Sequence, residues 1–516
     1  MKLEYKTLKD AQENFTWSER WEIFDKDRDH LNIAYECVDR HPKDKIGIRI
    51  KYSDRRTETY TFGEISRWSS QFANMLERYG VKKGDRVGLI MNPSLEYYVS
   101  FFGTLKRGAV AVPCYALLGP DGIEYRIKDS HSQMAIISRE RIDVVKPELV
   151  EHLIACEDLM DIIKDEDDSY TPDTSAETLA LIQFSSGTTG QPKQVLYKHA
   201  AMTVTTVFAK FWLGLREDDR YMCTSSPAWG HGIWYGTVGP MVIGAGIGVC
   251  SGKFEADILL EAMEEFEVTV VSVIPRVYKV LMESGIIDNY NLKFRRLTYT
   301  GSKIDTEVQQ YFLDKFGIFI GGNYGNTESG PIVIDFPFPD YTPRIGSSGK
   351  PMIGVKMGIL DDDDNELPTR QIGQVAVWRK DKWNPIGDYG FFDEDGYFWP
   401  QGRSDDVIKS SGYRIGPFEI ENVLEKHPSV QKAAVVGSPH EERGELVKAF
   451  IILESSTKPS EELVKEIQDF VKERLSMHEY PKLIEFVDQV PETPDGKLKR
   501  KELKRMEYEK MGVKLI

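Results

Sequence analysis

From residue 60 onward, the chain alternates between amphipathic helix patterns and short apolar strand patterns. Residues 60–80 place apolar side chains at the 3.6-residue spacing of a helix that ends at Gly80. Residues 82–91 predict a turn and a buried strand, residues 94–108 a second amphipathic helix, and residues 109–115 another strand. Because this alternation is typical of parallel sheets covered by helices, it predicts an α/β fold.

The helix and strand patterns alternate again at residues 125–138, 256–275 and 305–325, so the α/β character extends to about residue 340. Short apolar segments separated by turns then predict a small β-rich region. The Asp361–Asp364 run in that region fits a solvated hairpin turn better than a calcium loop, because it lacks the alternating ligands and closing glutamate of an EF-hand. Beyond Arg403 the patterns predict a small α+β domain.

The length of the chain, 516 residues, is too great for one hydrophobic core and predicts more than one domain. We expect the boundary in the linker at residues 403–406, so that residues 1–404 form the N-terminal domain and residues 405–516 the C-terminal domain. The predicted fold class is α/β, with a large N-terminal domain of several α/β layers and a β-rich subdomain, followed by a small α+β domain.

The charge and the cysteine pattern limit the partners and the compartment of the protein. A formal net charge of −16 argues against a general binder of nucleic acid or anionic membranes. The nearly apolar run at residues 237–250 is too short to span a bilayer, and the N-terminus has no apolar signal segment. Five scattered cysteines without a CxxC pair favour free thiols over disulfides or structural zinc. We therefore expect a cytoplasmic protein.

A glycine- and hydroxyl-rich segment at residues 185–193 directly follows an apolar strand pattern. Its sequence is Ser-Ser-Gly-Thr-Thr-Gly-Gln-Pro-Lys. The amides and hydroxyls of such a loop can surround a polyphosphate, although the GxxxxGK[ST] spacing of a Walker A loop is absent. Taken alone, the segment is either a polar turn or a phosphate-binding loop.

Three further motifs follow this segment along the chain: NYGNTESG at residues 323–330, a glycine- and acid-rich stretch at residues 387–406, and PDGKLKR at residues 494–500. In this order they resemble the adenylate-forming superfamily, and the resemblance runs from about residue 60 to the C-terminus. Residues 402–450 are similar in particular to medium-chain acyl-CoA synthetases and related acetyl-CoA synthetases. The resemblance implies a ligase that uses ATP, Mg²⁺ and coenzyme A, and that first joins a carboxylate to the α-phosphate of ATP.

The resemblance assigns roles in adenylate formation to individual residues. Thr188 would contact the phosphates, Glu328 would hold Mg²⁺, and Lys497 would bridge the substrate carboxylate and the α-phosphate, which makes these three the expected catalytic residues. Tyr324 would stack on adenine, and Asp388 would accept the ribose hydroxyls. The residues expected to bind ATP or AMP are Ser186, Gly187, Thr188, Thr189, Gly190, Lys193, Gly301, Ser302, Lys303, Asn323, Tyr324, Gly325, Asn326, Thr327, Asp388, Arg403 and Lys497.

Two positions depart from the family pattern. Gly322 stands where many relatives carry a polar residue that reads the adenine amino group, so backbone carbonyls or Asn323 are the expected substitutes. Asp495 stands where the family has Ser or Thr before the Gly-Lys pair, and it can either restrict access to the loop or pair with Lys497.

For the second step, transfer of the acyl group to coenzyme A, the resemblance implies a mobile C-terminal domain that turns about a hinge at Asp405. Arg414 is a further expected phosphate or substrate contact. Arg443 and Lys472 match residues that bind the CoA phosphates, and they fit surface charge equally well. The expected CoA-binding residues are Ser411, Gly412, Tyr413, Arg443 and Lys472.

The expected acyl pocket is bordered by Trp229 and Gly325. Acetyl-CoA synthetases carry a tryptophan directly after the adenine-stacking aromatic residue, whereas Gly325 stands there in this chain, which favours a short- or medium-chain, branched or aromatic acid. His231 is expected to be a hydrogen-bonded histidine at the pocket edge, because a carboxylic acid is already ionised near pH 7 and needs no base.

Three functions are compatible with these motifs. The favoured one is an AMP-forming carboxylic acid–CoA ligase of fatty acid metabolism, whose partners are a small carboxylic acid, ATP and CoA. The second is a stand-alone adenylation enzyme that loads a carrier protein, and the third is a non-catalytic acyl-nucleotide-binding protein. Retention of Thr188, Glu328, Asp388, Arg403 and Lys497 argues against the third. The oligomeric state, including a homo-oligomer, stays open.

Overall fold

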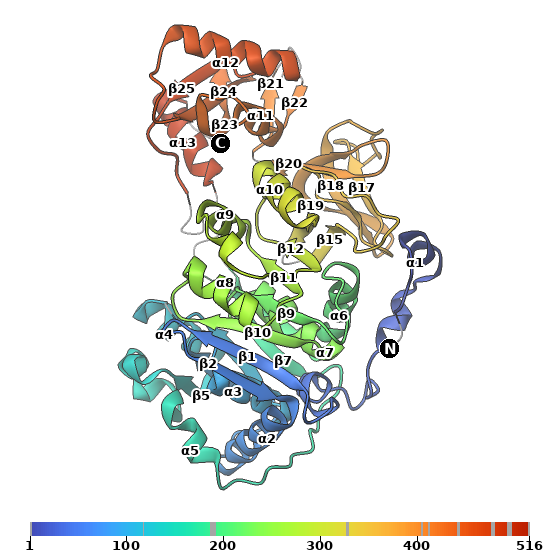
Figure 1. The fold of residues 1–516 in the computed structure, drawn as a ribbon, viewed down its shortest axis with the longest axis vertical. Coiled ribbons are helices and arrows are strands. Elements are labelled where there is room, and N and C mark those ends of the chain that lie inside the picture. Colours follow the sequence, from blue (N-terminus) through green and yellow to red (C-terminus); the bar gives the residue numbers. More distant parts are fainter. Residues whose placement is uncertain are drawn as a thin grey trace. The chain divides into compact units, whose positions relative to one another are not determined.

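The computed structural model describes residues 3–116, 118–185, 192–326, 330–403, 406–410, 413–440, 444–475, 480–492 and 498–513. The chain divides into two compact units, which Figure 1 shows in the colours of the sequence. The first unit consists of Met1–Gly322 with Phe336–Thr342, and the second of Asn323–Asp335 with Pro343–Ile516. The predicted domain boundary after residue 404 divides the chain differently and stays a prediction.

The first unit contains a six-stranded sheet with the strand order β6-β5-β3-β4-β7-β8. Every adjacent pair in it is parallel except β7 and β8. Thr61 and Glu64 form a reciprocal capping box at the start of α2, which explains why the predicted helix begins there. The elements of this layer are α2 (Phe62–Arg78), β3 (Arg86–Ile90), α3 (Leu95–Lys106), β4 (Val110–Cys114), α4 (Pro120–Ser130), β5 (Ser132–Ile137), β6 (His152–Ala155), α5 (Leu159–Ile163), β7 (Leu179–Ser185) and β8 (Lys193–Lys198).

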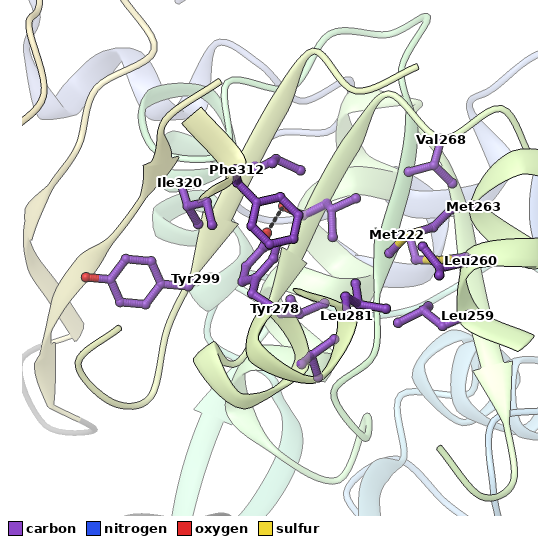
Figure 2. Close-up of a cluster of buried hydrophobic side chains, with 14 of the residues drawn as sticks. Met222, Leu259, Leu260, Met263, Val268, Tyr278, Leu281, Tyr299, Phe312 and Ile320 are labelled. Carbon is purple, nitrogen blue, oxygen red and sulfur yellow. Dashed lines mark hydrogen bonds between the residues drawn. The ribbon is translucent and has the colours of Figure 1, made fainter. Parts of the chain in front are cut away.

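A second sheet of the same unit has seven strands in the order β13-β12-β11-β9-β10-β1-β2. Only the β1–β2 pair in it is antiparallel among the described residues. Apolar side chains from α8, α9 and α10 pack on it, and Figure 2 shows Leu260, Tyr278 and Phe312 in this buried cluster. The elements are α1 (Leu8–Asn14), β1 (Ile46–Tyr52), β2 (Thr57–Thr61), α6 (Ala201–Phe211), β9 (Arg220–Cys223), α7 (Gly239–Ile243), β10 (Gly246–Ser251), α8 (Ala256–Glu265), β11 (Val270–Val273), α9 (Pro275–Glu283), β12 (Arg296–Tyr299), α10 (Thr306–Phe316) and β13 (Ile320–Gly321).

The second unit begins with two small antiparallel sheets, β14-β15-β16 and β17-β18-β19-β20. The predicted β-rich region is therefore confirmed. The Asp361 carboxylate accepts hydrogen bonds from the amides of Asp363 and Asn365, which closes the acidic stretch as a turn. The strands are β14 (Asn323–Asn326), β15 (Gly330–Ile334), β16 (Lys350–Pro351), β17 (Met357–Leu360), β18 (Gly373–Arg379), β19 (Lys382–Phe392) and β20 (Phe398–Arg403).

The C-terminal part of the second unit is an α+β arrangement around a five-stranded sheet, as predicted. Arg500 is buried at the start of α13, and its guanidinium donates to both oxygens of the Glu421 carboxylate at 2.6 and 2.7 Å. Glu421 lies on α11, so this ion pair ties two helices together. The elements are β21 (Ile408–Ser410), β22 (Tyr413–Ile415), α11 (Pro417–Leu424), β23 (Val430–His440), β24 (Gly444–Leu453), α12 (Glu461–Arg474), β25 (Leu483–Phe486) and α13 (Arg500–Lys510).

The predicted α/β class is confirmed, because both large sheets are mainly parallel and their strands alternate with helices along the chain. Within the described ranges, none of the helices combines the length and the apolar character that crossing a membrane requires.

Candidate active site

The predicted phosphate-binding loop connects the antiparallel strands β7 and β8. Ser185 and Lys193 are partners at the end of this pair, so the two ends of the loop lie opposite each other. Because β7 runs parallel to β4, the loop leaves the carboxyl edge of the six-stranded sheet, where α/β folds bind ligands. Lys193, at the base of the loop, is exposed.

Helix α4 holds the base of this hairpin on one side. The Tyr125 hydroxyl donates to the carbonyl of Pro192 at 3.0 Å, and the Gln194 amide donates to the Asp129 carboxylate at 2.7 Å. The Arg126 guanidinium lies 5.3 Å from the centre of the Phe184 ring. These supporting residues were not predicted from the sequence, because their partners lie far from them along the chain.

The loop at residues 301–303 follows β12 and begins with a glycine of positive φ. Gly301 has a φ of +98°, and a Cβ at this position would lie 3.2 Å from the Trp229 indole. The structure therefore brings the predicted adenine loop and the predicted acyl-pocket tryptophan together within the first unit. Ser302 is exposed, and Lys303 is half-buried.

His231 is a buried, neutral histidine. Its Nδ1 lies 2.7 Å from the Ser225 hydroxyl and its Nε2 lies 2.9 Å from the Ser272 hydroxyl. Burial lowers the pKa of His231 to about 3. The ring is 5.6 Å from that of Trp229, so it lies at the edge of the predicted pocket. With both ring nitrogens in hydrogen bonds, His231 orients its neighbours and is not placed to act as a base, as the sequence suggested.

Two predicted nucleotide-binding residues contact each other in the second unit. The Tyr324 hydroxyl donates to the Asp388 carboxylate at 2.6 Å, although the residues are 64 positions apart in the chain. The Tyr324 ring packs against Phe398 with ring centres 4.8 Å apart. Asp388 and Arg403 are opposite one another in the β19–β20 ladder. This arrangement places an aromatic ring next to a carboxylate within the second unit.

Gly325 has a structural role that the sequence did not reveal. A Cβ at this position would collide with the carbonyl oxygen of Gly330 and lie 2.9 Å from its carbonyl carbon. The register of β14 and β15 also shifts between Tyr324 and Gly325. Close approach of the two strands therefore explains this glycine, and Gly325 alone no longer indicates an open acyl pocket.

The base of the predicted lysine loop is closed by a bridge between Glu492 and Leu498. The Lys499 amide donates to the Pro491 carbonyl at 2.8 Å, and Glu492 also pairs with Lys432. The residues on either side of positions 493–497 are therefore held together, directly before the Arg500 ion pair. The remaining predicted CoA residue with a described side chain, Lys472, is exposed on the last turn of α12.

Several predicted residues lie outside the described residues, and their assignments stay predictions. No group of three or more His, Cys, Asp or Glu side chains in the described ranges forms a metal site, and the predicted magnesium ligand is itself outside them. Asn326, Arg403, Tyr413 and Arg414 are described by their backbone alone. The residues outside are Ser186, Gly187, Thr188, Thr189, Gly190, Thr327, Glu328, Asp405, Ser411, Gly412, Arg443, Asp495 and Lys497.

The fold is that of the adenylate-forming enzymes. It matches the crystal structure of the anthranilate–CoA ligase AuaEII in complex with anthranoyl-AMP with a TM-score of 0.83 and 27% sequence identity, over 97% of this chain and 100% of that one. The family model "AMP-binding enzyme" matches residues 35–381, and "AMP-binding enzyme C-terminal domain" matches residues 419–497. The chain belongs to the AMP-binding enzyme family.

Two curated relatives define the enzyme class. The acetyl-coenzyme A synthetase of Bacillus subtilis (strain 168) is 35% identical over 520 residues, 92% of this chain and 91% of the relative. The mitochondrial acyl-coenzyme A synthetase ACSM3 of Rattus norvegicus is 34% identical over 530 residues, 93% of this chain and 91% of the relative. The predicted class, an AMP-forming acid–thiol ligase that uses ATP, Mg²⁺ and coenzyme A, is confirmed.

Proposed function

We propose that this ligase activates a short- or medium-chain, branched or aromatic carboxylic acid as an acyl-adenylate and transfers the acyl group to free coenzyme A. The hydrogen bond between Tyr324 and Asp388 is the observation that carries the nucleotide half of this proposal. It fixes the edge of an aromatic ring beside a carboxylate, and these are the groups that stack on adenine and accept two ribose hydroxyls.

In the first step, the loop between Ser185 and Lys193 would surround the β- and γ-phosphates at the carboxyl edge of the sheet. Thr327 and Glu328 belong to the segment between β14 and β15, and we assign them the α-phosphate contact and the Mg²⁺ ligand. Lys497 would neutralise charge between the carboxylate and the α-phosphate, because two anions approach each other in this step.

For the second step, we assign residues 1–404 to nucleotide and acyl binding and residues 405–516 to a domain that turns about Asp405. Ser411, Gly412 and Tyr413 would form the edge that meets the pantetheine arm. Residues 411 and 412 connect β21 to β22, where Ser410 and Tyr413 are paired. The named activities of the two relatives, acetyl-CoA and acyl-CoA synthesis, support free CoA over a carrier protein as acceptor. We propose that the enzyme is cytoplasmic.

The acyl pocket is assigned to the surroundings of Trp229. This indole is partly exposed and lies against Gly301, so an acid beside it would be close to the loop proposed for adenine. The neutral His231 next to it adds no charge. Uncharged, aromatic surroundings favour an apolar acyl group, since each buried methylene contributes about 0.8 kcal/mol, or roughly fourfold in kcat/KM when the contact is realised in the transition state.

A panel of acids tests this function. AMP release and thioester formation are measured with acetate, butyrate, hexanoate, 2-methylbutyrate and benzoate, each with and without CoA. Acids of about four to eight carbons should exceed acetate by roughly one to two orders of magnitude in kcat/KM, and AMP release should need CoA for multiple turnovers. Preference for acetate would contradict the substrate class, and turnover only with a carrier protein would contradict the acceptor.

A matched pair of variants tests the nucleotide half. Tyr324→Phe removes the hydroxyl that bonds Asp388, and it should raise the KM for ATP about tenfold, since hydrogen bonds to charged groups contribute roughly 1.5–3 kcal/mol. Tyr52→Phe is the control, because the Tyr52 hydroxyl makes the same kind of bond, 2.7 Å to Glu58, in the first unit. Equal effects of the two substitutions on the KM for ATP would contradict the assignment.

A further inference from the structure

Gly322, directly after β13, lies against the ring of Tyr299. A Cβ on Gly322 would lie 2.7 Å from both the Cζ and the hydroxyl oxygen of Tyr299, and 2.8 Å from its Cε1. Contacts below about 3.0 Å would force neighbouring atoms to move. A side chain at position 322 would therefore displace the Tyr299 ring. The two residues are brought side by side by the parallel β12–β13 pair, in which Thr298 is the partner of Gly321. Tyr299 therefore fills the space that a side chain at position 322 would use.

The hydroxyl of Tyr299 is placed differently from that of the neighbouring buried tyrosine. Tyr278 directs its hydroxyl into the protein, where it donates to the Thr298 carbonyl at 2.9 Å. Tyr299 belongs to the same buried cluster, with 6% of its surface exposed, and Figure 2 shows its hydroxyl pointing away from the labelled apolar side chains. Tyr299 is also the last residue of β12, two positions before Gly301. Tyr299 therefore lies at the strand end from which the proposed adenine loop departs.

We propose that the Tyr299 hydroxyl is the group that contacts the 6-position of the adenine base in this enzyme. This inference rests on the proposed function, which sets the base against residues 301–303. A phenol hydroxyl has one donor and two acceptor sites, so it can accept from the 6-amino group while keeping a bond to the protein. Since Gly322 offers no side chain and the Tyr299 ring fills its place, Tyr299 supplies polarity to that side of the base.

A ligand–protein double cycle tests the contact directly. Dissociation constants of AMP and of purine riboside 5′-monophosphate, which lacks the 6-amino group, are measured by calorimetry for the native protein and for Tyr299→Phe. Loss of this hydrogen bond should weaken nucleotide binding by about fivefold, whether the protein loses the Tyr299 hydroxyl or the nucleotide loses its 6-amino group. If the two groups touch, Tyr299→Phe should bind both nucleotides equally, because the second deletion removes nothing further.

Tyr278→Phe is the matched control, because it removes a buried tyrosine hydroxyl from the same cluster but one that bonds to the backbone. It should keep the native protein's discrimination between the two nucleotides. Additive losses in the cycle, or the same loss of discrimination in Tyr278→Phe, would overturn the Tyr299 assignment. Native protein that binds neither AMP nor ATP would instead overturn the proposed function, so the two failures are distinguishable.

Discussion

The predicted site residues have different surroundings in the two units. In the first unit they follow the ends of parallel strands: the segment between Ser185 and Lys193 comes after β7, and the Gly301 loop comes after β12. In the second unit the predicted site residues Tyr324 and Asp388 already hold each other, and Arg500 and Glu421 form a similar pair outside the predicted site. Parallel strands present loops at one edge of a sheet. The side-chain pairs of the second unit instead join elements that are not partners in one ladder: β14 with β19, and α11 with α13.

This difference indicates how each unit should respond to substitution. Loops at strand ends can change without disturbing the sheet beneath them, so changes there should alter binding before stability. Paired side chains in the second unit serve both the fold and the site. Removing one partner leaves a buried charge or a misplaced ring, and stability should fall with function.

The largest expected effect is on the stability of the second unit. Arg500→Met leaves Glu421 without its buried bidentate partner, and it should lower the free energy of unfolding of this unit by about 3–5 kcal/mol. The change is measured by urea unfolding, with the hydrogen exchange of the α11 and α13 amides as the readout. Arg505→Gln is the control, since Arg505 and Glu509 form an exposed pair at positions i and i+4, and a loss below about 0.5 kcal/mol is expected. Similar losses in both variants would refute the role of burial.

The next effect separates the two half-reactions. Lys497→Ala should slow adenylate formation from free acid and ATP by about 10²–10³-fold, because in its proposed role the lysine charge lies where carboxylate and phosphate meet. Thioester formation from a supplied acyl-adenylate should change little. Lys499→Ala is the control, since Lys499 belongs to the same basic stretch and is paired with Glu502 at 3.6 Å. Equal loss in both half-reactions would mean that Lys497 is structural.

The smallest effect concerns acid stability of the first unit. His231 has a pKa of about 3 in the folded protein because it is buried, against about 6.5 in an unfolded chain. Between these values the unfolded state binds one more proton, so stability present above pH 6.5 is lost as the pH falls. His231→Gln removes this titration. The amount by which the free energy of unfolding of the variant lies below that of the native protein should therefore shrink by about 2 kcal/mol from pH 7.5 to pH 5. Urea unfolding at both pH values measures this, and an unchanged difference would contradict it.

The helix and strand patterns predicted much of the fold, because they depend on local periodicity. The helix at residues 60–80 and the strand at residues 82–91 correspond to α2 and β3. Apolar spacing is set by the geometry of each element, so it can be recognised without knowing its neighbours. The order of four motifs was sufficient to indicate the family for the same reason, since each motif is a continuous stretch of sequence.

What the sequence determined alone was therefore the kind of element at each place and the family to which the chain belongs. Only the tertiary structure decided why Gly325 and Gly322 are glycines, because the atoms that exclude a Cβ come from Gly330 on the next strand and from Tyr299 on another. It also joined Tyr324 to Asp388 across 64 positions. Such contacts depend on register and close packing between distant segments, which leave no periodic signal in the sequence.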